Sequence, residues 1–397
     1  MELQVQIEKM VYGGDGLARA EGQVVLAPFV LPGELVTVES QGSQKGVLRG
    51  RIASIDTPSA ERQSAPCRVF RRCGGCHYQQ APYATQLHWK QEIVRELFRR
   101  VGKMSAPEEM PLISAEPWEY RNRVQLHTID GSVGFLETGS RTLCPVSTCP
   151  ISSPRINQAI AALAAMARDT RWPRFLRSLE LFTNEEQVQL NVLETERPLA
   201  RWFFDWCEES MPGASAPLEY PTRDFTFRTG GRSFFQVNRF LIDTLVDTAL
   251  AGASGDMALD LYAGVGLFTL PLAKRFRSVT AVESGNSAVR DLEFNAQRAG
   301  VAVDIRRANT EDFLEEFAGS CDYVLADPPR TGLGKRVVKR LLDLHPRRVV
   351  IVSCDPATLA RDLAPLLAGG YGMERLVLVD LFPQTFHIEV IADLALR

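Results

Sequence analysis

The clearest hydrophobic pattern lies in the C-terminal part of the chain, where short apolar runs alternate with longer segments of helical spacing. Such short runs are typical of buried strands, and they comprise residues 257–261, 278–282, 323–326 and 349–353. Strands that alternate with helices predict an α/β fold with a parallel, doubly wound sheet. Two more apolar runs, at 376–379 and 388–392, add strands at the end of the chain.

The first 57 residues have a different pattern, in which apolar and polar positions alternate over short stretches, as in 3–7. A glycine-rich turn at 13–16 and further apolar stretches predict five short strands, and so a small barrel of the OB type. The polar, proline-containing residues 57–66 read as a linker.

The middle of the chain contains both helical spacing and the alternating pattern of strands. Residues 86–101 have helical spacing and many basic side chains, and an alanine-rich helix is expected at 157–168. Strands are expected near Val124, at 179–182 and at 188–192. We therefore divide the chain into a barrel at 1–57, a middle α+β domain at 58–230 and a sheet domain at 231–397.

A glycine loop follows the first strand of the sheet domain. Gly264 and Gly266 come just after Asp260 and open a helix, and Glu283 ends the next strand. Glycines let the backbone approach a ligand, and an acid at the second strand end can bind both ribose hydroxyls. Thr269 stands where a dinucleotide motif has its third glycine, which disfavours NAD, whereas Asp260 suits a cationic cofactor such as S-adenosylmethionine. The alternative is a tight turn without a ligand.

Three further polar positions are expected at the same edge of the sheet. Asp327 opens the rigid segment Asp-Pro-Pro-Arg after a strand, and Cys354 ends another strand just before a helix that begins at Pro356. A thiol near a helix N-terminus is expected to have a lowered pKa and to be nucleophilic, unless it is simply a small buried side chain. Glu389 stands in an apolar strand, where a carboxyl group can have a raised pKa and act as a base, unless it faces solvent.

Three of the eight cysteines, Cys67, Cys73 and Cys76, lie within ten residues, and two glycines separate the last two. Their thiolates could share a metal, with Cys144 or Cys149 as the fourth ligand. Spacing alone does not separate Zn²⁺ from an iron–sulfur cluster, but the five-residue gap and the remote fourth cysteine favour iron–sulfur with a structural role.

The composition is that of an ordinary globular protein. The 397 residues are 45% hydrophobic and 23% charged and carry a net charge of −3, which excludes disordered and collagen-like classes. We expect a cytoplasmic protein without membrane contact, since no apolar run could span a bilayer and the start of the chain does not resemble a signal peptide. The charge is uneven, because residues 45–103 hold twelve Lys or Arg and four acids, a net +8, which leaves −11 elsewhere.

Five motifs in this order resemble the RNA uracil-5-methyltransferases, which form 5-methyluridine in ribosomal and transfer RNA. They are Ser233-Phe-Phe-Gln-Val-Asn238, Asp260-Leu-Tyr-Ala-Gly-Val-Gly266, Asp327-Pro-Pro-Arg330, the run from Ser353 to Asp362, and Phe382-Pro-Gln-Thr-Phe-His-Ile-Glu389. The resemblance covers nearly the whole chain. The cysteine set and the N-terminal strands are similar to the branch that modifies 23S ribosomal RNA, which has a TRAM or OB-like RNA-binding domain and a [4Fe–4S] cluster.

The resemblance implies a Rossmann-like methyltransferase domain and a role for each matching residue. Cys354 would attack carbon 6 of uracil and Glu389 would remove the proton from carbon 5. The cofactor S-adenosyl-L-methionine would contact Gln236, Tyr262, Gly264, Gly266, Glu283, Asn309 and Asp327. The cluster ligands would be Cys67, Cys73, Cys76 and, from its Cys-Pro-Ile context, Cys149. The basic stretch 45–103 and the barrel would bind RNA. The protein is expected to be a monomer.

Two positions depart from the family pattern: Asp355 replaces an asparagine common after the cysteine, and Leu267 replaces a polar cofactor contact of some relatives. Methylation of transfer RNA is an alternative to ribosomal RNA. An amino-methyltransferase also has an acidic Pro-Pro motif, but an aromatic residue usually follows it, whereas Arg330 follows here. A non-catalytic RNA-binding protein with this fold is the third alternative.

Overall fold

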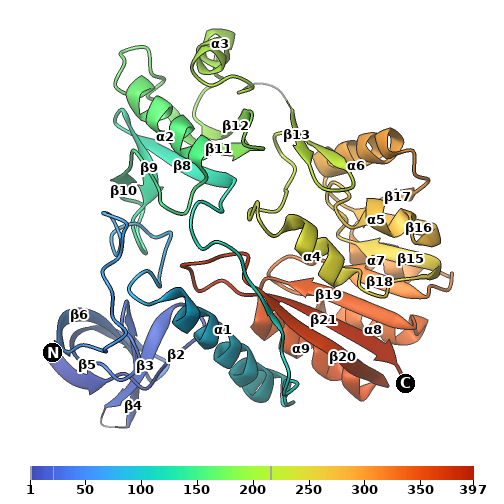
Figure 1. Cartoon of the computed structure of the whole chain (residues 1–397), viewed down its shortest axis with the longest axis horizontal. Helices are drawn as coiled ribbons and strands as arrows, with labels where there is room; N and C mark the ends of the chain where they lie inside the picture. Colours follow the sequence, from blue (N-terminus) through green and yellow to red (C-terminus); the bar gives the residue numbers. More distant parts are fainter. Residues whose placement is uncertain (1, 21, 215–216) are drawn as a thin grey trace. The chain divides into compact units, whose positions relative to one another are not determined.

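The computed structural model describes residues 2–20, 22–214 and 217–397 (Figure 1). Its contacts divide the chain into two compact units. The first comprises residues 1–96, 135–144 and 382–387, and the second comprises the rest. The division into three predicted domains is finer than this and stays a prediction. In the described residues no helix is long and apolar enough to cross a membrane.

The first unit begins with a six-stranded sheet in the order β1-β5-β6-β4-β3-β2. Its strands are β1 (Glu2–Gln6), β2 (Lys9–Met10), β3 (Asp15–Ala20), β4 (Gln23–Pro28), β5 (Leu35–Gln44) and β6 (Val47–Thr57). Alternate side chains, among them Val5, Val25, Val36 and Val38, build its core. Five strands were expected, but the sheet has six, because β2 is an extra short strand; the OB-type barrel stays a prediction.

The predicted linker after β6 is bound to this sheet through the buried carboxylate of Glu34. The carboxylate accepts hydrogen bonds from the backbone amides of Leu31 (2.7 Å) and Ser59 (3.1 Å) and from the Arg62 guanidinium (2.5 and 2.7 Å). Burial alone would raise the pKa of Glu34, but these donors, led by Arg62, hold it below its ordinary value. The ion pair therefore stabilises the folded unit at every pH at which Glu34 is ionised.

We expect Glu34→Gln to lower the free energy of unfolding by about 3 kcal/mol at pH 7, because the Arg62 charge loses its buried partner. A carboxyl group with a depressed folded pKa stabilises above its unfolded pKa and loses that effect as pH falls. The difference between variant and wild type should therefore shrink from pH 7 to pH 3.5 in urea unfolding. Glu39→Gln, which breaks the exposed pair with Arg51, is the control and should change stability by less than about 1 kcal/mol. A pH-independent difference at Glu34 would contradict the prediction.

The predicted basic helix is α1 (Tyr83–Leu97), which continues into a π-helical turn, η1 (Phe98–Gly102). Its buried face includes Gln86 and Lys90, and these bind the segment 382–387, which folds as part of this unit. Gln86 exchanges two hydrogen bonds with Gln384 (3.0 and 3.2 Å), and the Lys90 ammonium donates to the Phe382 carbonyl (3.0 Å). Lys90 is fully buried and Arg62 is paired with Glu34, so neither adds to a basic surface as the charge count suggested.

A five-stranded sheet has the order β10-β9-β8-β11-β12. Its strands β8, β11 and β12 belong to the second unit, as does a separate hairpin, whereas residues 135–144 belong to the first. The predicted strands and the alanine-rich helix are confirmed. Ser153 caps this helix by accepting a hydrogen bond from the Ile156 amide. The elements are β8 (Arg123–Ile129), β9 (Ser132–Leu136), β10 (Leu143–Pro145), α2 (Pro154–Met166), β11 (Leu176–Thr183), β12 (Val188–Thr195), α3 (Arg201–Ser210), the hairpin of β13 (Leu218–Pro221) and β14 (Thr226–Thr229), and α4 (Ile242–Ala249).

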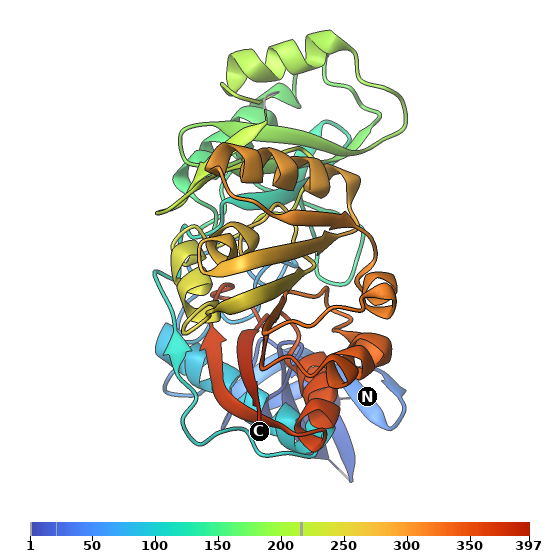
Figure 2. The ribbon, with the colours of Figure 1, turned by 90° about the vertical axis from the view of Figure 1, so that its right-hand side faces the viewer.

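The larger sheet of this unit has eight strands in the order β17-β16-β15-β18-β19-β21-β20-β7, and helices lie along its strands (Figure 2). Its strands are β7 (Leu112–Ile113), β15 (Gly255–Leu261), β16 (Phe276–Glu283), β17 (Asp304–Arg307), β18 (Tyr323–Ala326), β19 (Arg348–Ser353), β20 (Tyr371–Val379) and β21 (Glu389–Leu396). Its helices are α5 (Thr269–Ala273), α6 (Asn286–Ala299), α7 (Thr310–Glu316), α8 (Gly334–Leu344) and α9 (Pro356–Ala368).

The prediction of a parallel, doubly wound sheet holds for β15 to β19 but not for the whole sheet. The two terminal strands are present, but β21 runs antiparallel to both β19 and β20. The chain between β20 and β21 is too short for a helical crossover, which a parallel connection requires. This reversal brings the first residue of β21, Glu389, to the edge where the parallel strands end.

Candidate active site

The larger sheet brings the predicted polar residues together at one edge. Leu261 pairs with Ala326, so Asp260 near the end of β15 and Asp327 just after β18 are neighbours. Ser353 pairs with Val390 across the antiparallel strands, which sets Cys354 beside Glu389. Carboxyl ends of parallel strands are the usual ligand edge of such a sheet. The thiol, the candidate base and two further acids therefore share one site.

The glycine loop between β15 and α5 is fastened to Glu283 at the end of β16. The Glu283 carboxylate accepts hydrogen bonds from the amides of Gly264 (3.0 Å) and Gly285 (2.6 Å). Gly266 has a positive φ of 97°, and a Cβ there would lie 2.5 Å from the Leu292 side chain. Glycine is thus required at position 266 by both conformation and space, as its place in the motif predicts.

Asp260 is the most buried acid of this edge, with 1% of its surface exposed. Burial raises its pKa to about 7, although a hydrogen bond from the Thr269 hydroxyl to Oδ2 lowers it. The other oxygen, Oδ1, is buried without a hydrogen-bond partner. A buried carboxylate oxygen that no protein group satisfies fits a donor or a positive charge on a ligand. Thr269, in place of a third glycine, therefore has a function in holding Asp260.

The thiol of Cys354 does not have the lowered pKa that its position before a helix suggested. Burial raises its pKa to about 12, and the charges of Glu389 and Asp327 add to this, whereas Arg330 lowers it. The N-terminus of α9 is already capped, since the Asp355 carboxylate accepts from the amides of Ala357 (3.0 Å) and Thr358 (2.8 Å). The cap offsets the helix dipole that the thiolate would otherwise feel.

The two acids beside Cys354 have raised pKa values of the kind expected for Glu389. Glu389 is 4% exposed, and burial followed by the charge of Asp327 raises its pKa well above the ordinary value. Burial raises the pKa of Asp327 to about 7. Arg330 lowers the pKa of Glu389 as it does that of Cys354. The sequence assigned Arg330 no role, and its cationic effect on both groups appears only once the strands are side by side.

Helix α6 joins two parts of the site through polar residues on its buried face. The Asn295 side chain binds both the amide (2.8 Å) and the carbonyl (3.1 Å) of Arg228 and the carbonyl of Val265 in the glycine loop (3.0 Å). Asp291 accepts from the Gly230 amide (2.7 Å) and the Ser233 hydroxyl (2.5 Å). The segment that leads to Gln236 is thereby aligned with the glycine loop.

Neither α6 residue was singled out in the sequence. Asp291 and Asn295 are 3% and 1% exposed. Polar side chains at the core-facing positions of a predicted helix were the sequence feature that could have identified them. Buried polar groups require partners, so such positions indicate a hydrogen-bonded connection.

Tyr262 and Asn309, two predicted cofactor residues, are brought close by the chain after β17. Asn309 stands at the start of α7, next to Thr310, whose side chain hydrogen-bonds to that of Tyr262. The amide of Ala308 donates to the Glu283 carbonyl (3.1 Å). Tyr262 has a positive φ of 65°, which is uncommon for a residue with a side chain and is often found at functional sites.

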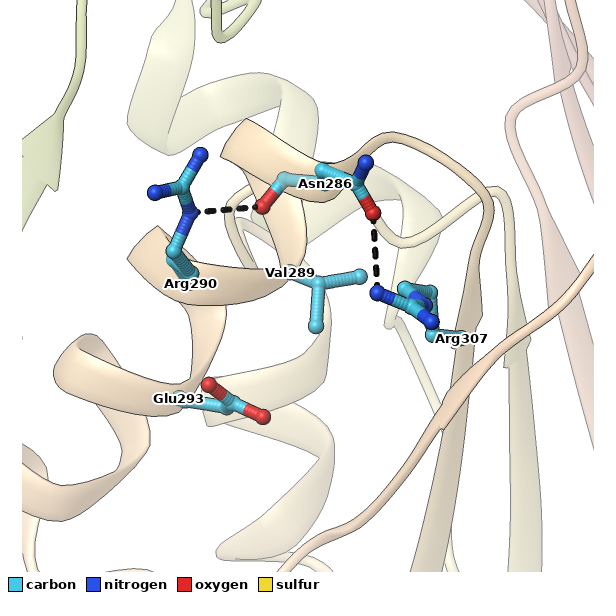
Figure 3. A pocket seen from close by; sticks show the side chains of 5 residues that line it. All are labelled: Asn286, Val289, Arg290, Glu293 and Arg307. Carbon is cyan, nitrogen blue, oxygen red and sulfur yellow. Dashed lines mark hydrogen bonds between the residues drawn. The ribbon is translucent and has the colours of Figure 1, made fainter.

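A separate cavity of about 380 Å³ lies between α6 and the end of β17 (Figure 3). It is lined by Asn286, Val289, Arg290, Glu293 and Arg307, and the Arg307 guanidinium donates to the Asn286 side chain (3.1 Å). No predicted site residue lines it. We therefore do not count it as part of the candidate active site.

The predicted cluster cysteines are divided between the two units. Cys67, Cys73 and Cys76 belong to the first unit, together with the buried Cys144, and Cys149 belongs to the second. The described residues include all eight cysteines, yet no group of three or more His, Cys, Asp or Glu side chains among them is arranged to hold a metal ion. The four-thiolate site is therefore not shown by the structure and stays a prediction, and no step of the chemistry is assigned to it.

The pattern of the whole chain matches known RNA-modifying enzymes. The family model of the tRNA (uracil-5-)-methyltransferases matches residues 214–395. An RNA methyltransferase of Aquifex aeolicus is 32% identical, with 100% of this chain and 99% of that protein covered. One of Streptomyces coelicolor is 33% identical, covering 99% of this chain and 92% of that protein.

One solved structure is similar over the full length. The Pyrococcus abyssi tRNA (uracil-54, C5)-methyltransferase in complex with S-adenosyl-L-homocysteine has a TM-score of 0.79 and 25% identity, covering 98% of this chain and 99% of that chain. The chain belongs to the RNA uracil-5-methyltransferase family. It is an S-adenosylmethionine-dependent RNA methyltransferase, as the motifs predicted.

We expect Thr269→Val to destabilise the protein by about 2 kcal/mol at pH 8.5, because both oxygens of ionised Asp260 would then lack a donor. The pKa of Asp260 is higher in the folded than in the unfolded protein, so ionisation of this group destabilises the folded state. The destabilisation begins above the unfolded pKa and grows until the pH exceeds the folded pKa of about 7. The loss should therefore be smaller at pH 5.5, as measured by urea unfolding. Thr280→Val, whose hydroxyl reaches only the exposed Asp304 at 3.4 Å, is the matched control. Equal losses at both pH values would refute this account of Asp260.

Proposed function

We propose that this enzyme transfers a methyl group to carbon 5 of a specific uridine in RNA through a covalent bond to Cys354. The observation that carries the proposal is the cross-strand adjacency of Cys354 and Glu389 at the edge that also holds Asp260, Asp327 and the glycine loop. A nucleophile and a base in contact are the minimum that such chemistry requires.

S-adenosylmethionine supplies a methyl group on a cationic sulfur when it is bound. The glycine loop and Glu283 would hold its ribose, with Gln236, Tyr262, Asn309 and Asp327 as the other contacts. The unsatisfied Oδ1 of Asp260 and the raised pKa values of Asp260 and Asp327 fit a cation. A positive charge beside these acids would also lower the pKa of the Cys354 thiol, whose proton must leave before it can attack.

The chain's own groups then act on the uracil ring. The Cys354 thiol loses its proton to solvent, and the thiolate sulfur bonds to carbon 6 as the double bond between carbons 5 and 6 breaks. Carbon 5 thereby becomes nucleophilic, and Arg330 stabilises the negative charge that develops on the ring. Once carbon 5 carries the methyl group, the Glu389 carboxylate takes the proton from carbon 5. The bond between Cys354 and carbon 6 then breaks, and the thiolate is released. The target base must leave its stack to reach the sheet edge.

We expect Cys354→Ala to abolish methyl transfer while S-adenosylmethionine still binds, since the glycine loop does not depend on the thiol. Glu389→Gln should stop after methylation and accumulate a covalent protein–RNA adduct that is visible by denaturing electrophoresis, because the proton is not removed. Cys321→Ala is the control, as this buried thiol lies at the other end of β18 from Asp327. Turnover by Cys354→Ala would sink the covalent mechanism.

We propose 23S ribosomal RNA as the substrate, with transfer RNA as the second candidate, and a cytoplasmic monomer as the working form. The cysteine set and the N-terminal strands support the ribosomal choice, whereas the matched family model and the similar solved structure carry transfer RNA in their names. Methylation of 23S ribosomal and transfer RNA transcripts, with 5-methyluridine mapped by mass spectrometry, decides between them. Methyl groups found only in transfer RNA would overturn the ribosomal proposal.

A [4Fe–4S] cluster on Cys67, Cys73, Cys76 and Cys149 is part of the proposal, with support from their spacing and from the resemblance. We expect about four irons per chain and a brown colour in protein purified without oxygen. Cys149→Ala should lose the iron, and Cys144→Ala should retain it. Zinc in place of iron, or iron loss only in Cys144→Ala, would contradict this assignment.

A further inference from the structure

Large hydrophobic side chains are exposed at only six positions of the described chain, and two of these lie within five residues of Gln236 in the sequence. Phe234 and Phe240 are 60% and 38% exposed, while the four residues from Phe235 to Asn238 are buried. Two exposed aromatic rings in seven residues at the edge of an enzyme site are unlike the scattered single residues of an ordinary surface. An exposed aromatic ring at such a place can bind something flat and apolar.

Each ring is covered on one side by a guanidinium group. The Arg239 Cζ lies 4.4 Å from the centre of the Phe240 ring, and the Arg123 Cζ lies 5.7 Å from that of Phe234. Arg239 is held in place, because its Nε donates to the Glu119 carbonyl (2.9 Å). An aromatic face next to a fixed positive charge matches a nucleotide, which has a flat base and an anionic phosphate.

Phe240 is also tied to the edge of the sheet that carries the candidate base. The Asn238 side chain is fully buried, accepts from the Phe240 amide (3.1 Å) and donates to the Leu381 carbonyl (3.2 Å). Leu381 follows β20, whose last residue, Val379, pairs with Glu389. The Arg239–Phe240 pair therefore lies near the end of β20 at the rim of the candidate site.

We propose that Arg239 and Phe240 form a stacking platform for an unpaired RNA nucleotide next to the target uridine. This inference rests on the proposed function, because a uridine that leaves its stack exposes the face of its neighbour. The Phe240 ring replaces the lost stacking partner, and the Arg239 guanidinium attracts the adjoining phosphate. A base in a continuous duplex has both faces covered, so the platform selects single-stranded RNA.

Trp202 on α3 is the natural comparison, since it is 47% exposed and also aromatic. Three acids, Asp205, Glu208 and Glu209, lie on the same short helix and would repel a phosphate backbone. Trp202→Ala is therefore the matched control for the removal of an exposed ring.

The test compares the full-length wild type with Phe240→Ala, Phe240→Trp and Trp202→Ala. We expect Phe240→Ala to weaken binding of a fluorescein-labelled single-stranded uridine decamer roughly tenfold, the effect of one lost base stack. The KM for a 23S ribosomal RNA transcript should rise with little change in kcat or in S-adenosylmethionine affinity. Phe240→Trp should restore binding, and Trp202→Ala should match the wild type.

Arg239→Gln tests the phosphate contact separately. On single-stranded RNA it should reduce the slope of log affinity against log salt by about 0.7, the value for one released counterion. Normal decamer binding and KM for Phe240→Ala in an active enzyme would overturn the platform and leave the proposed function intact. An equal loss of affinity for an A-form duplex would also overturn it. A wild type that neither binds nor methylates RNA would overturn both.

Discussion

The burial of three carboxyl groups and one thiol at a single sheet edge, with repulsion among them as a smaller effect, is the constraint on which the site depends. Asp260, Asp327 and Glu389 have raised pKa values, and the charges of the last two also raise that of Cys354. Charges of one sign in a poorly solvated site favour their neutral forms. Arg330 counters this effect at Glu389 and Cys354. An edge of this kind is suited to a cationic ligand and is poorly suited to an anionic one.

The rest of the second unit holds this edge in register. Antiparallel pairing fixes Glu389 beside Cys354, and Thr269 fixes Asp260 from the first turn of α5. Asn295 connects the glycine loop with the segment that precedes Gln236, so a single helix aligns two stretches that are distant in sequence. The connections through Thr269 and Asn295 use buried polar side chains that are hydrogen-bonded within the protein, which makes the arrangement specific as well as stable.

The first unit contains a segment that the sequence assigned to the methyltransferase domain. Residues 382–387 follow β20 and precede Glu389, yet they pack with Gln86 and Lys90 of α1. The Lys90 ammonium is buried against the Phe382 carbonyl, so a side chain counted as part of a basic surface is instead a structural donor. A charge count along the chain cannot distinguish these roles, because burial depends on contacts between residues almost three hundred positions apart.

The sequence by itself determined the strand–helix alternation, the glycine loop and the identities of Cys354, Glu389 and the acids near them. These depend on local periodicity and on motifs, both of which can be read from neighbouring residues. Only the tertiary structure decided the reversed strand β21, the capping of α9 by Asp355, the raised pKa of Cys354 and the polar connections of α6. Each of these depends on strand direction, burial or charge across long sequence separations, and such properties exist only after the chain has folded.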